Sequence, residues 1–412
     1  MPPEKHSNGR SDKMKNGILT FHSQLNYGGV LQCWALQTAL EKLGHDVVVI
    51  DRWMNEKNST LELEYGAFGF KQWIKFAIRA SLGLGDINQW LRVRRTKRFL
   101  KQYINRTPYH FVDWGKAPKD LGVDMLVVGS DQVWHCGDWG DPRVYLLEGA
   151  PKVPAVSYAA SFGMTELPTA LGIDAKGAEG HAAEPVYKRG LSRFGAISCR
   201  EAEGVAICRN LGFDAEHVVD PTLLAWGEGA KERSRQSKKR ELVCYFLSEN
   251  IEDYFDSLNA FAKAHDCKVK VLMNGAWFVA APSNLARIKN MLKSWKRRLS
   301  PRVVLMDSAG PAEFYKAFKS ASWVVSDSFH ALMFSIFNGC NVRMIRPSSD
   351  FRRNMFARIE EFAAHAKGPL IVDSVRAALD SFAKGESVDF DYGWISERRA
   401  ESKAWLELVI GG

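Results

Sequence analysis

Short apolar runs alternate along the chain with longer segments in which apolar residues recur at helical spacing. The clearest unit begins with an apolar run at 18–21, which predicts a buried strand, followed by a polar loop at 22–27. Residues 28–43 then have the period of a helix, Gly44 suits the position after its end, and the run at 47–50 predicts the next strand. Such units are typical of a mostly parallel sheet covered by helices.

The same alternation runs through both halves of the chain. In the first half, further strands are expected at 125–128, 156–160, 196–199 and 218–219. In the second half, strands are expected at 242–247, 269–272, 303–306, 323–326 and 342–345, and helices at 251–264, at 285–296, from Pro311 and from about Ser328. We therefore predict an α/β protein of two Rossmann-like, doubly wound domains that face each other across a cleft.

Changes in composition predict the domain boundaries. The polar start predicts a disordered tail at 1–16, before a first domain at 17–225. A basic, glycine-containing stretch predicts an exposed linker at 226–240, before a second domain at 241–387. Residues 388–412 have a helical pattern at 394–409, and we expect this helix to pack back on the first domain.

A basic helical insertion is predicted within the first domain at 66–108. Between 70 and 105, one helical face would carry Phe70, Trp73 and Ile74, whereas Lys71 and Lys75 would lie on another. An ordinary surface helix explains this pattern. A helix in the interface of an anionic membrane is the alternative.

Charge and hydrophobicity limit the classes of partner and the cellular compartment that the sequence favours. The 412 residues are 46% hydrophobic and carry a net charge of +9, which favours an anionic partner. The basic runs lack interleaved aromatic residues, so no nucleic acid is expected. The chain has no signal-peptide pattern and no apolar run of about 18 residues, which predicts a cytoplasmic protein, with peripheral contact at the inner face of the membrane as a hypothesis for 70–105.

The seven cysteines are scattered singly and have no metal-ligand spacing, so neither a metal nor another cofactor is predicted. Cys199 lies next to Arg200, whose charge would lower the pKa of a thiol, and a nucleophilic role is one interpretation. Its apolar surroundings in the sequence favour the other interpretation, which is a buried core thiol.

Two polar loops that follow predicted strands of the first half are candidate site segments. The loop at 22–29 offers His22, Asn26 and Tyr27 before a helix begins, and it has neither a dinucleotide fingerprint nor a triphosphate-binding motif. The loop at 129–134 brings Asp131, Gln132 and Trp134 to a strand end. An ordinary turn with a cap, and a Trp134 in the core, are the structural alternatives.

Two further strand ends carry candidate cationic and acid–base groups. Arg200 falls at the start of a predicted helix, where the helix dipole disfavours a cation, and this conflict indicates anion binding. His330 follows Ser328 in the first turn of a helix in the second half. The dipole there lowers the pKa of an imidazole and keeps it neutral near pH 7, ready for acid–base work. A surface ion pair of Arg200 and a structural His330 are the alternatives.

With these loops in order, the sequence resembles the polysaccharide pyruvyl transferase family over about 17–359. The resemblance rests on GILTFHSQLNYGGVLQCWALQ, DMLVVGSDQVW, VSYAASFG, ISCREAEGVAIC, VVDPTLL and VVSDSFHALMFSIFNGC. It implies a scaffold similar to that of GT-B glycosyltransferases. It also implies transfer of a pyruvyl group from phosphoenolpyruvate, as co-substrate, to two hydroxyls of a sugar, forming a cyclic ketal in cell-surface polysaccharide (exopolysaccharide or capsule) biosynthesis.

The resemblance also implies roles for single residues. Arg200, His330 and Asp131 become the catalytic candidates, with Arg200, Ser328 and His330 at the donor. The acceptor, a sugar or a lipid-linked oligosaccharide, would meet the remaining loop residues, which are His22, Asn26, Tyr27, Gln132 and Trp134. Family members often carry Ser-x-Arg-x-His where this chain has Ser326, Ser328 and His330. Because Ser328 replaces that arginine, Arg346, Arg352 and Arg353 downstream are candidate substitutes for the donor clamp.

Two other function classes stay open at this point. One is a glycosyltransferase that uses a sugar nucleotide on the same scaffold. The other is a non-catalytic partner in a polysaccharide assembly complex, held at the membrane by the basic segment at 70–105.

Overall fold

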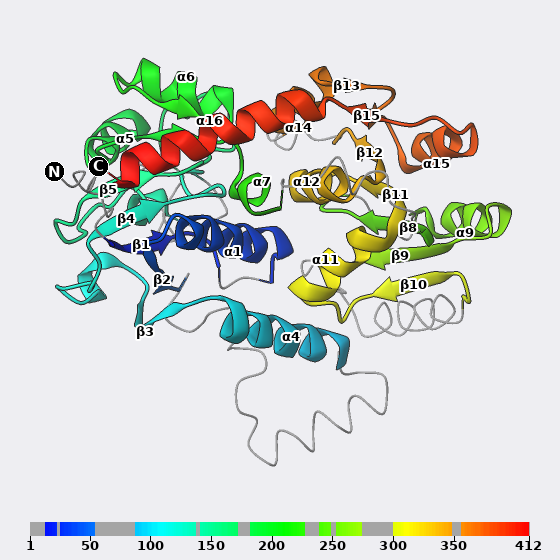
Figure 1. Cartoon of the computed structure of the whole chain (residues 1–412), viewed down its shortest axis with the longest axis horizontal. Coiled ribbons are helices and arrows are strands. Elements are labelled where there is room, and N and C mark those ends of the chain that lie inside the picture. The colour runs from blue at the N-terminus through cyan, green and yellow to red at the C-terminus, as the bar shows by residue number, and fades with distance from the viewer. Residues whose placement is uncertain are drawn as a thin grey trace, which may run out of the picture.

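The computed structural model describes residues 13–22, 25–53, 87–136, 141–171, 182–226, 239–248, 253–273, 300–347 and 356–411. Two parallel sheets, one in each half of the chain, organise this structure (Figure 1). Their central strands are continuous apolar runs because helices cover both faces of each sheet.

The first domain contains a parallel sheet in the order β3-β2-β1-β4-β5. Its strands are β1 (Lys15–Leu19), β2 (Asp46–Arg52), β3 (Arg106–Phe111), β4 (Met125–Val128) and β5 (Ala155–Ser157). Single parallel bridges, from Val156 to Ala196 and from Ala160 to Cys199, continue the sheet toward β6 (Ser198–Cys199) and β7 (Glu216–His217). The order reverses between β1 and β4, so the first domain has a Rossmann-like switch point there.

The second domain repeats this topology in the order β10-β9-β8-β11-β12-β14. Its strands are β8 (Lys239–Tyr245), β9 (Lys268–Leu272), β10 (Val303–Met306), β11 (Ala321–Ser326), β12 (Asn341–Ile345) and β14 (Ile371–Val372). A separate antiparallel pair joins β13 (Ala366–Lys367) to β15 (Asp389–Phe390). The switch point of this sheet lies between β8 and β11.

Helices connect the strands and bring the two domains together. Those of the first domain are α1 (Tyr27–Lys42), α4 (Ile87–Tyr103), α5 (Ala183–Leu191), α6 (Ala202–Asn210) and α7 (Pro221–Trp226), with short 3-10 turns η1 (Trp114–Lys116) and η2 (Pro142–Val144). The second domain has α9 (Phe255–Ala264), α11 (Pro311–Ser320), α12 (Phe329–Asn338), α14 (Ala357–Ala364) and α15 (Val375–Ala383), and α16 (Tyr392–Gly411) follows.

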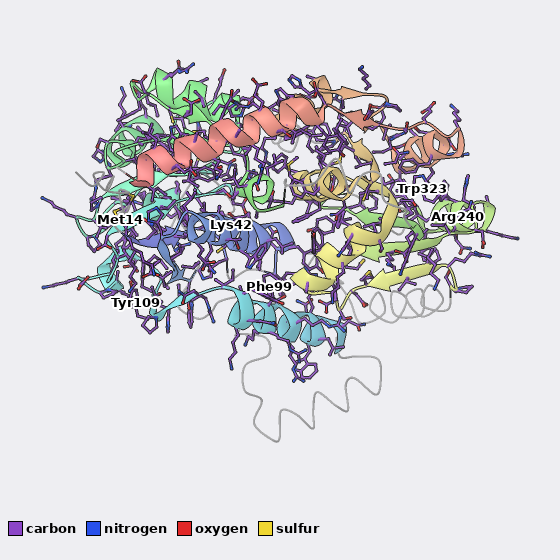
Figure 2. All side chains as sticks on the ribbon, viewed as in Figure 1. Met14, Lys42, Phe99, Tyr109, Arg240 and Trp323 are labelled. Carbon is purple, nitrogen blue, oxygen red and sulfur yellow. The ribbon has the colours of Figure 1, made fainter. Side chains whose placement is uncertain are left out.

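The two Rossmann-like domains face each other, which confirms the predicted fold class. Side chains fill the space between α1 and α11 (Figure 2). Tyr27, at the start of α1, stacks on Phe314 of α11 with ring centroids 4.5 Å apart. The hydroxyl of Tyr27 donates a hydrogen bond to the carbonyl of Ala309 at 2.9 Å. One apolar cluster therefore runs through both domains.

The structure describes only the second part of the predicted basic insertion at 66–108. Residues 54–86 lie outside the described residues, α4 covers 87–103, and Arg106–Phe111 is strand β3 of the first sheet. On α4, the buried Arg92 donates to the carbonyls of Met273 and Leu25, and Arg95 donates to Ser308. Arg92 and Arg95 belong to the basic segment for which membrane contact was a hypothesis. In the structure, both residues join the two domains.

Helix α16 lies across both domains along one side of the molecule (Figure 1). Arg398 donates to the carbonyl of His217, and Arg399 donates to the carbonyl of Leu223, both in the first domain. Ser402 accepts a hydrogen bond from the backbone N–H of Val219 at 2.9 Å. The helix that follows the second domain in the chain therefore completes the surface of the first.

The ends of the predicted domains differ in detail from the structure. Strand β1 begins at Lys15, inside the tail predicted at 1–16, because Lys15 and Asn16 pair with β2. Residues 227–238, which hold most of the predicted linker, and the predicted helix at 285–296 lie outside the described residues. None of the helices in the described residues is long and apolar enough to cross a membrane.

Candidate active site

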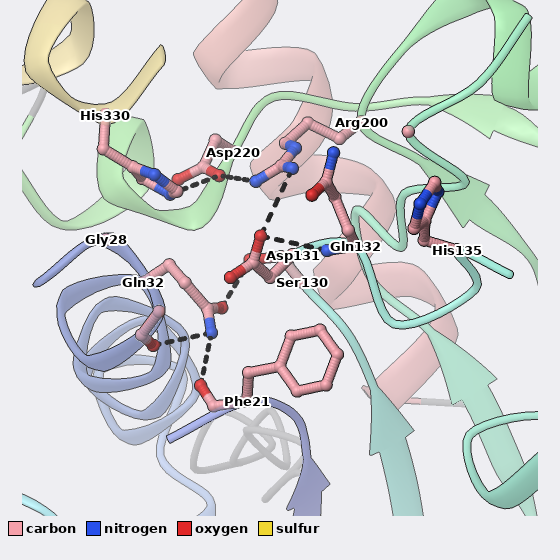
Figure 3. Close-up of polar contacts among 12 residues, drawn as sticks. Phe21, Gly28, Gln32, Ser130, Asp131, Gln132, His135, Arg200, Asp220 and His330 are labelled. Atoms are coloured by element: carbon pink, nitrogen blue, oxygen red, sulfur yellow. Dashed lines mark hydrogen bonds and ion pairs between the residues drawn. The ribbon is translucent and has the colours of Figure 1, made fainter. Parts of the chain in front are cut away.

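The carboxyl ends of β1 and β4 meet the start of α12 at the junction of the two domains. Figure 3 shows Asp131, Arg200, Asp220 and His330 in one chain of polar contacts. Three of them come from the first domain, and His330 comes from α12 of the second. Parallel α/β sheets place ligand sites at this edge of a switch point.

Arg200 follows β6 directly, and its side chain is almost fully buried. Its Nη1 donates to Oδ2 of Asp220 at 2.9 Å, whereas Nη2 lies 3.6 Å from Oδ1 of Asp131. The latter distance is too long for a hydrogen bond. Nε and Nη2 are buried and have no hydrogen-bond partner. Buried guanidinium N–H groups without a partner are costly, so a ligand that accepts from them would be stabilised here.

Asp220 lies between Arg200 and His330. Its Oδ1 accepts from the backbone N–H and the hydroxyl of Thr222, while Oδ2 accepts from Arg200. Burial raises the pKa of a carboxyl group, but the nearby His330 and Arg200 and these hydrogen bonds together hold the pKa of Asp220 below its ordinary value. Asp220 is therefore ionised and fixes the guanidinium in place.

His330 lies in the first turn of α12, with Nε2 3.8 Å from Oδ2 of Asp220 and without a hydrogen-bond partner. Burial lowers the pKa of His330, and the opposing effects of Asp220 and Asp131 do not outweigh it. The imidazole is thus neutral near pH 7 and can accept a proton.

Backbone of the first domain packs directly against that imidazole. A Cβ at Gly28, in the first turn of α1, would lie 2.3 Å from Nδ1 of His330. Asn26 caps α1 by accepting hydrogen bonds from the N–H groups of Gly28 and Gly29. The cap and the glycine together allow the amino-terminal end of α1 to approach the second domain closely.

The loop after β4 is held to α1 through Gln32. The hydroxyl of Ser130 donates to Oε1 of Gln32 at 2.6 Å, and Nε2 of Gln32 donates to the carbonyls of Gly29 and Phe21 (Figure 3). Asp131 has a positive φ of 75°, and its Oδ1 accepts from the backbone N–H of Gln132. This network aims the Asp131 carboxylate at Arg200.

Three residues predicted to bind the acceptor lie elsewhere. The imidazole of His22 is fully buried and contacts Asp51 and the carbonyl of Thr20. Tyr27 is buried in the domain interface described above. Trp134 is fully buried against Phe162, and its indole N–H donates to the carbonyl of Tyr145, so the ring offers no face to a sugar. For Trp134, the structural alternative is correct.

The other predicted residues are distributed around the site. Ser328 is the residue before α12, and its backbone N–H donates to the hydroxyl of Ser326. Arg346 is exposed and pairs with Glu360 at 2.6 Å. Gln132, partly buried, lies beside Gly163. Arg352 and Arg353 lie outside the described residues.

Cys199 is a core residue. Its thiol is fully buried, lies 3.8 Å from the sulfur of Cys208, and has a pKa raised well above the ordinary value by burial. A thiol of this kind stays protonated and is a poor nucleophile. Among the described residues, no group of three or more His, Cys, Asp and Glu side chains could hold a metal ion.

A small pocket opens between the domains next to the polar chain. Arg200, Asp220 and Phe329 line it, together with Glu361 and Arg398. The pocket therefore reaches the polar chain at Arg200 and Asp220.

The family assignment rests on a match over most of the sequence. The profile of the family described as polysaccharide pyruvyl transferase matches residues 26–349 of the 412-residue chain. The chain belongs to the polysaccharide pyruvyl transferase family. The family expected from the six sequence motifs is thus confirmed, and its name identifies a transferase.

Solved structures of similar fold are distant in sequence. The UDP-GlcNAc 2-epimerase of Methanocaldococcus jannaschii is 13% identical with a TM-score of 0.43, covering 97% of this chain and 100% of that chain. The UDP-N-acetylglucosamine 2-epimerase of Rickettsia bellii is 10% identical with a TM-score of 0.48, covering 97% and 96%. MurG of Acinetobacter baumannii is 11% identical with a TM-score of 0.40, covering 95% of each chain. A comparison with curated proteins finds no match.

Sequence reasoning missed three polar residues of this transferase-family site. Asp220 follows the strand expected at 218–219 and stands in the motif VVDPTLL, but it is not among the candidate site residues from the sequence. Gln32 lies on α1 among apolar residues, where nothing in the sequence marks its contact with Ser130. Arg358, on α14, lies with its guanidinium carbon 5.1 Å from the centre of the Phe329 ring. It lies well beyond the end of the strand expected at 342–345, so the strand ends did not indicate it.

Proposed function

We propose that this chain transfers the pyruvyl group of phosphoenolpyruvate to two hydroxyls of a sugar and forms a cyclic ketal. One observation carries the proposal: two buried N–H-bearing nitrogens of Arg200, without hydrogen-bond partners, lie in the same polar chain as the neutral imidazole of His330. Phosphoenolpyruvate carries a phosphate and a carboxylate, which are the groups that a guanidinium binds best. Membership of the family supports the same reaction.

In the proposed reaction, His330 takes the proton of the first sugar hydroxyl and passes it to the methylene carbon of the donor, while the hydroxyl oxygen attacks the neighbouring carbon, which becomes electrophilic. Phosphate leaves as its C–O bond breaks, and the second hydroxyl closes the ketal. Of the two hydroxyl protons, one ends on the new methyl group and the other leaves with phosphate. The overall step needs neither an oxidant nor a reductant.

The residues of the site have separate roles in this scheme. Nε and Nη2 of Arg200 bind the donor anion, while Asp220 keeps the guanidinium oriented. His330, neutral at rest, accepts a hydroxyl proton and returns it to the methylene carbon. Asp131, on the first-domain side, faces the acceptor hydroxyls. These positions match general acid–base catalysis combined with anion binding.

The proposal also covers the acceptor, which we propose is a sugar or oligosaccharide carried on a lipid, with the protein in the cytoplasm. A lipid-linked acceptor lies at a membrane surface, and α4 presents the exposed Arg94 and Arg98. Both cations would favour an anionic surface. Peripheral contact with the membrane is therefore part of the proposal.

Incubation of the purified chain with phosphoenolpyruvate and lipid-linked acceptors containing galactose, mannose or glucosamine tests the reaction. We expect release of inorganic phosphate together with a pyruvylated acceptor in the mass spectrum. His330→Gln should abolish both, whereas Arg302→Met, which removes an exposed partner of Asp266, should change neither.

The contrary results are equally specific. If phosphoenolpyruvate does not bind in calorimetry and a nucleoside diphosphate does, the chain is a glycosyltransferase that uses a sugar nucleotide. If His330→Gln leaves product formation intact, the proposed site is wrong.

A further inference from the structure

The positive charge of Arg200 is already offset by nearby carboxylates. The carboxylates of Asp131, Glu201 and Asp220 all act on its guanidinium and raise its pKa, although burial lowers it. Asp220 already holds Nη1. With His330 neutral, three carboxylates face one arginine. An anionic donor at this place therefore requires a second cation.

Arg358 brings such a cation to the same place from α14 of the second domain. Its guanidinium carbon lies 5.1 Å from the centre of the Phe329 ring, and that of Arg200 lies 5.2 Å from the same centre. Phe329 is the first residue of α12, directly before His330. Two guanidinium groups, one from each domain, thus converge on one ring beside the acid–base candidate.

The position of Arg358 on its helix is unfavourable for stability. It is the second residue of α14, and a cation in the first turn is repelled by the helix dipole. Burial and the charge of Arg200 also lower the pKa of Arg358, to about 10, so it stays protonated at pH 7. The carboxylates of Glu201, Asp131 and Asp220 act in the opposite direction on Arg358, so both guanidinium groups belong to one cluster of buried charges next to His330.

We propose that Arg358 is a donor-binding residue, which together with Arg200 binds the phosphate and carboxylate of the anionic donor. The inference rests on the proposed function. Ser328, at the start of α12, provides no charge, and Arg358 reaches Phe329 from the neighbouring helix instead. The donor anion would contact both guanidinium groups and offset the repulsion by which Arg200 lowers the pKa of Arg358.

Calorimetric titration with phosphoenolpyruvate tests this assignment in the full chain. Arg358→Met keeps much of the apolar contact with Phe329 and removes the charge, so we expect the Kd to rise about 10- to 100-fold, the effect of a lost hydrogen bond to a charged group. Arg358→Lys should fall between wild type and the Met variant, because it retains the charge without the planar fork. If Arg358 only packs on the Phe329 ring, the Arg358→Lys and Arg358→Met variants will have the same Kd for phosphoenolpyruvate.

Arg302→Met is the matched control, since Arg302 pairs with Asp266 at 2.9 Å on the surface and has no role in the proposed site. Its Kd should equal that of wild type. An unchanged Kd in any folded variant that lacks the guanidinium at 358 overturns the inference and leaves the proposed function standing. Absence of phosphoenolpyruvate binding by the wild-type chain overturns both.

Discussion

Asp220 determines the geometry of the site at the scale of single residues. One of its oxygens holds Thr222 at the start of α7, and the other holds Arg200 and lies 3.8 Å from His330. The carboxylate is completely buried, so water cannot replace these contacts. Removing its charge would leave the guanidinium of Arg200 with a weaker partner in the interior.

Asp220→Asn should therefore reduce the free energy of unfolding by about 3–5 kcal/mol, the usual cost of breaking a buried ion pair from one side. Asp266→Asn removes an equally short but exposed pair with Arg302 and should cost about 0–1 kcal/mol. Urea titration of both variants measures the difference. Equal losses would show that the Arg200 pair contributes no more than a surface pair.

The lowered pKa of His330 predicts how stability depends on pH. The unfolded chain binds a proton at 330 near pH 6.5, whereas the folded chain resists it until the pH is lower. The titration of His330 therefore costs no unfolding free energy above pH 6.5. Below pH 6.5, it lowers the unfolding free energy as the pH falls toward the pKa of the folded state.

His330→Gln removes this contribution, while the other titrating groups remain in both proteins. We expect the wild-type chain to lose more unfolding free energy than the variant between pH 7 and pH 5, as measured by urea midpoints at each pH. Parallel pH curves would mean that the pKa of His330 is not lowered by folding.

At the scale of secondary structure, the apolar runs predicted the central strands and α1. These elements show in the sequence because the spacing of their buried residues is local. Strand β3 was missed, since its residues RTPYHF alternate weakly and include a proline, and only pairing with β2 makes it a strand. Strand ends located Asp131, Arg200 and His330. Arg358 and Gln32 could not be found in this way, because their roles arise from packing between helices and loops distant in sequence.

Helix α4 provides a test of domain contact at this scale. Arg92 is completely buried, lies over the Tyr27 ring at 4.5 Å, and donates to carbonyls in both domains. Arg92→Met should lower the free energy of unfolding by roughly 3 kcal/mol through the loss of two charge-assisted hydrogen bonds.

Arg98→Met on the same helix is the control, since Arg98 is exposed and its replacement should change stability by less than about 0.5 kcal/mol. Chemical denaturation compares the two. A similar midpoint for both variants would contradict a joining role for the buried face of α4.

Considered as a whole, the molecule is closed at its site. Gly28 of one domain lies directly against His330 of the other, and Arg200 and Arg358 approach the same ring from opposite domains. The geometry of the site therefore depends on the distance between the two domains. The absence of a side chain at Gly28 allows the short distance seen here.

Gly28→Ala should reduce phosphate release at least about tenfold while leaving the fold intact, since the new methyl group displaces the imidazole from Asp220. Gly195→Ala is the control, because a Cβ there meets only the carbonyl of Ala155 at an ordinary 3.8 Å. Full activity in Gly28→Ala would show that the close contact is not part of the working geometry.

Helix α16 has a consequence for synthesis on the ribosome. Its Trp405 contacts Tyr158 of the first domain, and its Leu406 belongs to the same apolar cluster as Tyr158 and Leu223. The whole second domain must be translated before this helix emerges. At about 5–20 residues per second, the delay is on the order of ten seconds. During that time the nascent first domain exposes the apolar surface that α16 later covers, and exposed apolar surface of this kind favours aggregation.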